Sequence, residues 1–243
     1  VTVTDANSAT ATSSVSVSVI PTGTVPYSED FESGAGGWFS GGNASSWEMG
    51  SPNGGTINSD APGGGTQSWM TGLNADYNNN ENSWVQGPCF DFSGETDDQV
   101  ITMDIWWNSE SSWDGAVLQS SIDGGSSWQN VGALNDPNNW YNDNSINGNQ
   151  GGQQTGCSGR SSSGNGSGGW VSASNTLTGL AGEANVFLRI AFGSDGSVSD
   201  DGFAFDNISI ADSSPTPLAA DAGADVVICQ GATTIIGGNP AAS

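Results

Sequence analysis

The 243-residue sequence contains no histidine and no lysine, and Arg160 and Arg189 are its only cations. The chain therefore lacks the bases that activate a serine or cysteine nucleophile and the imidazole ligands common at zinc sites. Nucleic-acid binding requires clustered Lys and Arg that displace counterions, so DNA and RNA are excluded as partners, and anionic membrane surfaces are disfavoured for the same reason. We find no signal-peptide pattern and no apolar run near the roughly 20 residues of a membrane span, so direct membrane insertion is not expected.

Acidic and aromatic residues are abundant by contrast. Twenty-six Asp and Glu set against two Arg give a formal net charge of −24, and ten Trp and eight Phe supply apolar surface for a core. That aromatic content argues against disorder of the whole chain. Salt screens charge repulsion over roughly 8 Å, so such a surface stays soluble at high ionic strength. We expect an extracellular or cell-surface location in a saline habitat.

Strand patterns dominate the sequence, and helix patterns are nearly absent. Alternating Val and Ser over 15–19 is typical of a half-buried strand, and Asp123-Gly124-Gly125 is typical of a tight hairpin. Many short strands joined by Gly and Asn turns predict an all-β fold, an antiparallel β-sandwich of the jelly-roll type. Further strands are predicted over 100–106, 116–121, 186–192 and 203–210.

Two proline-containing seams divide the chain, the first over 20–26 and the second over 213–218. Because the chain starts in the middle of a strand pattern, we expect it to be a segment of something longer. The predicted parts are the last strands of a preceding domain (1–20), a linker (21–26), the central sandwich (27–212), a second linker (213–220) and the first strands of a following domain (221–243).

Three cysteines cannot all pair with one another. Cys89 and Cys157 are candidates for a disulfide, which would leave Cys229 to find a partner outside the segment. Cys157 lies within 142–169, a polar and glycine-rich stretch that is either a surface loop or a binding loop. The pairing and the role of the loop both stay open at this point.

The central part resembles MAM-type and concanavalin-like jelly-roll domains of large secreted proteins from Bacteroidetes-like bacteria. The resemblance covers most of 27–212. The strings that carry it include Asp30-Phe31-Glu32-Ser33-Gly34, Trp113-Asp114-Gly115-Ala116 and Asp201-Gly202-Phe203-Ala204-Phe205-Asp206-Asn207-Ile208.

The flanks resemble PKD- or Ig-like repeats, on Val1-Thr2-Val3-Thr4-Asp5-Ala6-Asn7 and on 221–231. Such arrays occur in giant cell-surface adhesins, including gliding-motility adhesins exported by the type IX secretion system. Ser8 stands where the repeat commonly has Cys, so the first repeat is expected to lack the disulfide that Cys229 would make in the later one.

Calcium prefers carboxylate and carbonyl oxygens, which this sequence supplies. Asp30 and Glu32 would share one face of a strand while Phe31 enters the core, and the resemblance implies that both converge with Asp206 on a structural Ca²⁺ between the first and last strands. The alternative is solvated acids that protect a sheet edge. Asp114, Asp195 and Asp201 form a weaker set, explained by turn chemistry or by a second cation.

Enzymatic activity is not expected. Glycoside hydrolysis needs only two carboxyl groups, but the alternating Glu/Asp/Glu strand motif of laminarinase-like jelly rolls is missing. Sugar binding combines flat aromatic faces with polar side chains. Trp140 and Tyr141, with Trp107 and Trp113, are the candidate ligand-binding residues, and core packing is the alternative for most of the tryptophans.

These observations predict a non-enzymatic, Ca²⁺-stabilised module of a secreted or surface adhesin. Its expected partner is a polysaccharide or another surface ligand, or neighbouring modules of the same chain, and self-assembly stays open. The first alternative is a structural spacer or extracellular filament subunit without a ligand of its own. The second alternative is a jelly-roll glycoside hydrolase.

Overall fold

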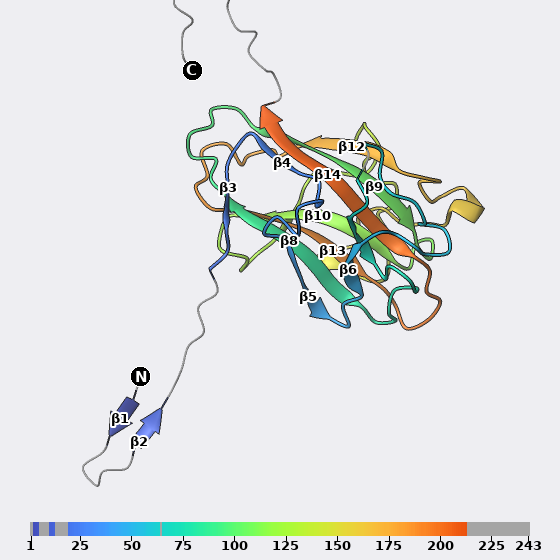
Figure 1. The fold of residues 1–243 in the computed structure, drawn as a ribbon, viewed down its shortest axis with the longest axis horizontal. Helices are drawn as coiled ribbons and strands as arrows, with labels where there is room; N and C mark the ends of the chain where they lie inside the picture. Colours follow the sequence, from blue (N-terminus) through green and yellow to red (C-terminus); the bar gives the residue numbers. More distant parts are fainter. Residues whose placement is uncertain (1, 5–9, 13–18, 64, 213–243) are drawn as a thin grey trace, which may run out of the picture. The chain divides into compact units, whose positions relative to one another are not determined.

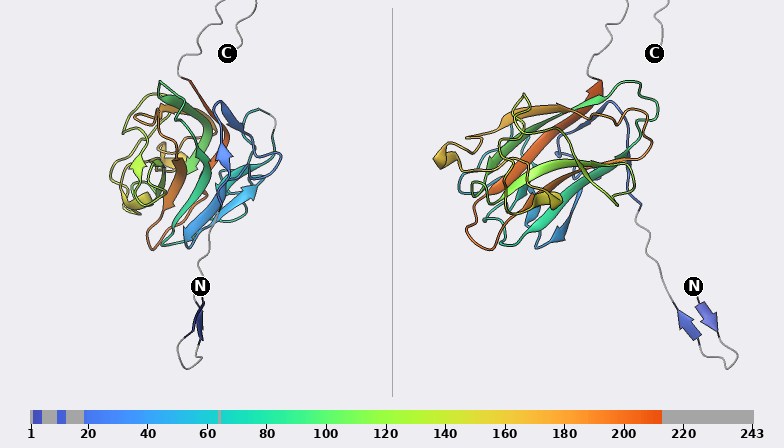
Figure 2. Two further views of the ribbon diagram at one scale, coloured as in Figure 1. Left: turned by 90° about the vertical axis from the view of Figure 1, so that its left-hand side faces the viewer. Right: turned by 180° about the vertical axis from the view of Figure 1, so that it is seen from behind.

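The computed structural model describes residues 2–4, 10–12, 19–63 and 65–212. Residues 19–212 fold into a sandwich of two mostly antiparallel β-sheets, seen from three sides in Figures 1 and 2. A separate antiparallel hairpin pairs β1 (Thr2–Thr4) with β2 (Thr10–Thr12). Helix among the described residues is limited to two 3₁₀ turns, η1 (Gln150–Gly152) and η2 (Ser161–Ser163). The all-β prediction is confirmed.

One layer, which we call the β10 sheet, has the strand order β11-β10-β13-β8-β3, and β5 also pairs with β8. Its pairs are antiparallel apart from β3, which runs parallel to β8. The strands are β3 (Thr22–Gly23), β5 (Phe39–Asn43), β8 (Asn82–Phe90), β10 (Gly115–Ser121), β11 (Gln129–Asn130) and β13 (Val186–Gly193).

The other layer, the β14 sheet, has the order β12-β9-β14-β7-β6, and β4 also pairs with β14. The pairing of β4 with β14 places the first and last strands of the predicted central domain side by side. The strands are β4 (Tyr27–Glu29), β6 (Trp47–Gly50), β7 (Ser68–Thr71), β9 (Gln99–Asn108), β12 (Val171–Thr176) and β14 (Gly202–Asp212).

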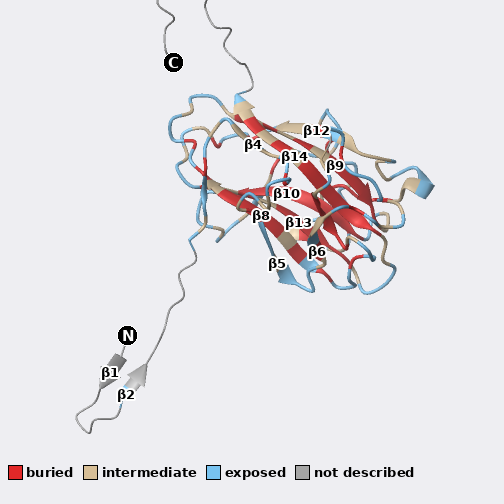
Figure 3. Cartoon of the chain, in the orientation of Figure 1, coloured by how far each residue is buried: buried red, intermediate tan, exposed pale blue. Residues whose placement is uncertain are grey.

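The core lies between the inner faces of the two sheets, where Figure 3 shows buried residues along the long strands. Residues in a strand point alternately to opposite faces, so every second side chain enters this layer. In β9 these are Ile101, Met103 and Ile105, and in β13 they include Leu188 and Ile190, all at most 3% exposed. Packed aromatic rings add edge-to-face contacts, and burial of this surface is the main force that holds the sheets together.

The four strands predicted over 100–106, 116–121, 186–192 and 203–210 are confirmed as parts of β9, β10, β13 and β14. The predicted hairpin joins β10 to β11, and Gly124 and Gly125 there have φ of 74° and 84°, which favours glycine. The alternating segment 15–19 lies almost entirely outside the described residues.

The chain divides into two compact units, Val1–Ser213 and Ser214–Ser243. The second unit lies outside the described residues, together with the linker predicted over 213–220, the repeat predicted over 221–243 and Cys229. The domain boundaries and the flanking Ig-like repeats therefore stay predictions. The described residues include no helix with the length and apolar character that a bilayer crossing requires.

Candidate functional site

A row of polar side chains crosses the outer face of the β10 sheet. Gln119 of β10, Arg189 of β13 and Gln86 of β8 are direct cross-strand neighbours. The adjacent residues Leu118 and Leu188 are buried in the core, so alternation turns the polar row outward. We call the outer surface around this row the open face.

Arg189 is the centre of the row. Its Nε and Nη2 groups donate hydrogen bonds to Gln119 Oε1 at 3.0 and 2.8 Å. Its Cζ atom lies 3.9 Å from the centroid of the Trp128 ring, a cation–π distance. Burial lowers the pKa of the guanidinium to about 10, so it is charged at neutral pH. The open face therefore presents a fixed positive charge stacked on an indole.

A cavity of about 370 Å³ lies beside this pair. The long loop 142–169 builds one of its walls, because Gln119 Nε2 donates to the Gly151 carbonyl and Asn130 Nδ2 donates to Gln153 Oε1. These bonds tie the loop to the sheet. The cavity is lined by Gln119, Trp128, Gln129, Asn130, Gly151, Gly152 and Gln153.

Two more aromatic rings continue the open face beyond Gln86. Phe39 of β5 is 38% exposed, and its ring meets that of Trp84 edge to face with centroids 5.5 Å apart. The Trp84 ring lies over Gly41, where an added Cβ would come 2.5 Å from the indole. Indole surfaces therefore flank the polar row on both sides, with Trp128 at one end and Trp84 at the other.

A larger hollow of about 510 Å³ lies between the β10–β11 hairpin and residues 177–180. Its lining includes Ile122 and Asp123 but no aromatic ring and no cation. The Asp123 carboxylate already accepts hydrogen bonds from the Ser127 side chain and backbone and from the Ser121 side chain, which hold its pKa down to about 2. This hollow offers fewer specific contacts to a ligand than the open face does.

Three of the four predicted ligand-binding aromatics are core residues, which corrects that prediction. Trp107, Trp140 and Tyr141 are 7%, 5% and 4% exposed. Their polar atoms bond to backbone carbonyls of Asn165, Val131 and Leu118. Rings packed and satisfied in this way present no face to a ligand.

Trp113 is the exception, because it is 44% exposed. Gln119, Arg189 and Gln86 were missed in the sequence, although their alternate positions in strands were a usable signal. Arg189 was also conspicuous as one of only two cations.

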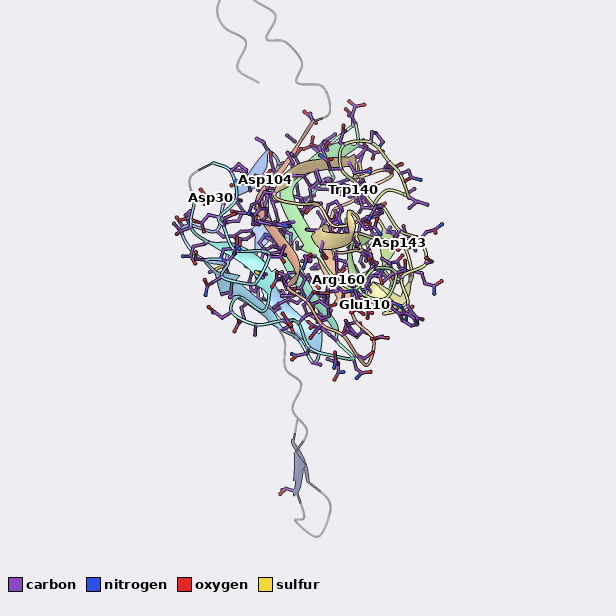
Figure 4. The ribbon with its side chains drawn as sticks, turned by 90° about the vertical axis from the view of Figure 1, so that its right-hand side faces the viewer. Asp30, Asp104, Glu110, Trp140, Asp143 and Arg160 are labelled. Carbon is purple, nitrogen blue, oxygen red and sulfur yellow. The ribbon has the colours of Figure 1, made fainter. Side chains whose placement is uncertain are left out.

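Asp206 lies in a group of acidic side chains on the outer face of the β14 sheet. It is 2% exposed and directly opposite Asp104 of β9. Burial first, and then the charges of Asp104, Glu32 and Asp30, raise the pKa of Asp206 to about 7. Figure 4 shows Asp30 and Asp104 on a part of the molecule well apart from Glu110 and Arg160.

A buried hydroxyl without a partner adjoins this group. The pairing of Phe205 with Trp69 places Ser68 opposite Asp206 on the same face. Ser68 Oγ is buried and has no hydrogen-bond partner among the described residues. A buried polar atom left unpaired is costly unless a further ligand satisfies it.

Asp30 and Glu32 do not lie in a strand, which corrects that part of the prediction. β4 ends at Glu29, and Phe31 has φ of 57° in a turn, although its ring enters the core as expected. Glu32 Oε1 accepts hydrogen bonds from the backbone N–H groups of Thr66 and Gln67 at 2.6 Å each. The turn thus brings both acids toward Asp206 from outside the sheet.

The weaker acidic set is partly brought together. Oxygens of Asp114 and Asp195, with those of Glu110, lie within 4.8 Å of one another, a spacing that suits a cation. Asp114 is fully buried, and burial raises its pKa to about 6. Its oxygens accept hydrogen bonds from the Tyr77 hydroxyl at 2.6 Å and from the Asp195 N–H at 2.8 Å. Glu110 was missed in the sequence because it lies outside any Asp-Gly turn.

Asp201 belongs to neither group. Its carboxylate accepts hydrogen bonds from the backbone N–H groups of Gly55, Thr56 and Ile57. It therefore anchors the backbone of residues 55–57.

Cys89 and Cys157 are both free, which corrects the suggested disulfide. Cys89 of β8 pairs with Phe187 of β13, whereas Cys157 forms a bridge to Ala116 of β10. β13 separates the two strands, so the cysteines are too far apart for a disulfide. Burial raises the pKa of the Cys157 thiol to about 12, which makes it unreactive.

No protein-family profile matches this chain, and no curated protein matches it. Among solved structures, the K1 cleaved adhesin domain of Lys-gingipain from Porphyromonas gingivalis W83 is 12% identical, with a TM-score of 0.44 over 78% of this chain and 99% of that one.

Two carbohydrate-binding modules show a similar likeness. TmCBM61, solved with β-1,4-galactotriose, is 10% identical with a TM-score of 0.42, over 75% of this chain and 93% of that one. The C-terminal family 22 module of Clostridium thermocellum Xyn10B is 13% identical with a TM-score of 0.41, over 76% and 92%. These values are too low to carry a function to this chain. The MAM-type and PKD-type resemblances stay predictions.

Proposed function

We propose that this chain is a non-catalytic module of a secreted or surface adhesin that binds a polysaccharide on the open face of the β10 sheet. The observation that carries the proposal is the stacked pair of Trp128 and Arg189 beside a cavity of about 370 Å³. Flat rings and planar polar groups on one surface are what sugar recognition uses.

The shape of the open face favours a chain of sugars over a single small molecule. The polar row and its flanking indoles cross β10, β13, β8 and β5, so several sugar units can contact it together. The Gln119 amide is held by Arg189 and by the Gly151 carbonyl, and Trp84 is supported by Gly41. Groups held rigidly before binding lose little entropy when a ligand arrives.

The burial and hydrogen bonding of the clustered carboxylates favour binding over catalysis. Glycoside hydrolysis needs two carboxyl groups that reach the substrate. In the cluster of Glu110, Asp114 and Asp195, Asp114 is 0% exposed and its two oxygens are already hydrogen bonded. The open-face row itself contains amides and a guanidinium, which hold a sugar but transfer no proton at neutral pH.

Affinity electrophoresis through gels that contain single polysaccharides tests the binding proposal. We expect at least one polysaccharide to retard the chain and Trp128→Ala to weaken that retardation about tenfold or more, since aromatic anchors dominate binding energies. Trp113→Ala is the matched control, because it removes an exposed indole elsewhere. Loss of binding in the Trp113 variant alone would move the site away from the open face.

We further propose that Ca²⁺ binds beside Asp206 and stabilises the fold. Asp206 and Asp104 face each other, Asp30 and Glu32 approach from the turn after β4, and Ser68 Oγ lacks a partner. Hard oxygen donors of this kind suit Ca²⁺. A bound cation would also relieve the mutual repulsion of the carboxylates.

A further inference from the structure

The two arginines of this chain have different kinds of partner. Arg160 Nε lies 2.7 Å from Asp200 Oδ2, and this is the one ion pair among the described residues. Arg189 instead bonds to the neutral amide of Gln119, in a chain that carries 26 acidic residues. With so many carboxylates available, a partly buried cation without one is unusual, because buried charges are normally paired.

The guanidinium also keeps free donors. Arginine has five N–H groups, and the two hydrogen bonds to Gln119 occupy two of them. The other three, on Nη1 and Nη2, have no acceptor in the part of the chain that the structure describes. Trp128 covers one face of the guanidinium plane, so it fixes the orientation of these donors.

Gln86 lies beside Arg189 on the same face. Its side chain is 9% exposed. It is the direct cross-strand neighbour of Arg189 on the open face. A polar ligand that pairs with the free guanidinium donors can therefore also reach this amide.

We propose that the polysaccharide bound by the open face carries widely spaced acidic groups, and that Arg189 binds a carboxylate or sulfate group of one sugar while Gln86 bonds to the same unit. A densely charged polyanion stays excluded, because the 26 acidic residues of the chain would repel it. Arginine presents parallel donors that match two oxygens of such a group, and charge-assisted bonds of this kind are about twice as strong as neutral ones. The inference rests on the proposed polysaccharide-binding function and names the chemical class of its ligand.

Matched pairs of polysaccharides test this inference in the full chain. Pectin with a small fraction of free carboxylates is compared with its fully methyl-esterified form, and a sparsely sulfated galactan is compared with its desulfated form. We expect the acidic member of at least one pair to bind ten or more times tighter than its neutral partner. Preference within the first pair identifies a carboxylate, and preference within the second identifies a sulfate.

Variants separate the role of charge from that of the scaffold. Arg189→Gln should remove the preference for the acidic member, whereas Arg160→Gln, which removes the same charge elsewhere, should keep it. Arg189→Lys retains the charge without the planar fork and should bind about tenfold weaker than the wild type. Near-identical melting temperatures for these variants confirm that folding is not the cause.

Equal binding of both members of each pair, still lost in Trp128→Ala, would overturn the acidic-ligand inference and leave the proposed function standing. Binding to none of the polysaccharides would overturn both. An unchanged preference in a folded Arg189→Gln variant would also overturn the inference.

Discussion

The outer faces of the two sheets of this sandwich differ in how they are covered. On the β14 sheet, Met70, Trp106 and Ala204 point away from the main core, yet they are covered by Ile57 and by Trp170. On the β10 sheet, Gln119, Arg189 and Gln86 point away from the core with a cavity and indole rings beside them. One outer face is a second small core. The other has a polar row in which Gln119 and Gln86 are 1% and 9% exposed, beside a half-buried Arg189 and half-buried indole rings.

The cover on the β14 sheet depends on carboxylates. Asp201 holds the backbone of residues 55–57, and Asn207 Nδ2 bonds to both Asp104 and the Pro62 carbonyl. With two arginines and no lysine, acidic side chains find backbone N–H groups as partners instead of cations. Acidic side chains therefore hold the covering segment on the β14 sheet, whereas the open face carries an arginine without an acidic partner.

The sharpest test of the comparison removes one tryptophan from each face in turn. Trp106→Ala on the covered face should lower the free energy of unfolding by about 3–5 kcal/mol, the usual range for a buried Trp. Trp84→Ala on the open face should cost clearly less stability and should instead weaken polysaccharide binding. Urea unfolding measures the first quantity and affinity electrophoresis the second. Equal stability losses for the two variants would break the comparison.

Removal of the anchor under the covering loop is expected to have the next largest effect. Asp201→Ala leaves three backbone N–H groups without an acceptor, so we expect a loss of about 2–4 kcal/mol in unfolding free energy. Asp60→Ala is the control, because this exposed residue of the same loop bonds only to Ser51. Comparable effects of the two changes would show that the loop is not fastened by Asp201.

Calcium binding is expected to stabilise the folded chain further, through the covered face. At a hundred times its dissociation constant, a ligand of the native state adds about 2.7 kcal/mol, or roughly 5–10 °C in melting temperature. Asp206→Asn should abolish the response to Ca²⁺, whereas Asp195→Asn should keep it. A response lost only in the Asp195 variant would transfer the cation to the cluster of Glu110, Asp114 and Asp195.

A smaller effect is expected in the pH dependence of stability, and it comes from Asp114, which belongs to neither outer face. Burial raises the pKa of Asp114 from 3.8 to about 6. The native state therefore binds this proton more tightly than the unfolded chain, and the stability contribution is complete below pH 3.8 and lost as the pH rises to about 6. Asp114→Asn should remove about 2 kcal/mol of this pH dependence, measured by urea unfolding in chelator at pH 4 and pH 7. An unchanged pH dependence of stability in this variant would contradict the raised pKa of Asp114.

Much of the fold was predictable from the sequence. Alternation over 186–192 and 203–210 predicted β13 and β14 because each strand has one face in the core. The strand period even predicts which side of β13 Arg189 occupies. Sequence alone does not predict which outer face a distant loop will cover, and Asp201 bonds to residues about 145 positions away.

The candidate site was less predictable for the same reason. Trp140 and Tyr141 adjoin a polar loop, which favoured a surface role, but the loop folds back and both rings enter the core. Trp128 immediately precedes β11 and meets Arg189 of β13 although β10 lies between these two strands, a long-range contact without a local signal. The resemblance predicts Asp30 and Asp206 as neighbours, whereas the buried, unpaired Ser68 hydroxyl is evident only from the three-dimensional fold.

Indole N–H signals in a ¹⁵N-correlated NMR spectrum test the central claim most directly, because each of the ten tryptophans contributes one signal. An oligosaccharide of the best-retained polysaccharide is titrated into the labelled chain. We predict that the signals of Trp128 and Trp84 move together and saturate, while those of Trp106 and Trp170 stay in place. Movement of the covered-face signals, with Trp128 unchanged, would contradict the account.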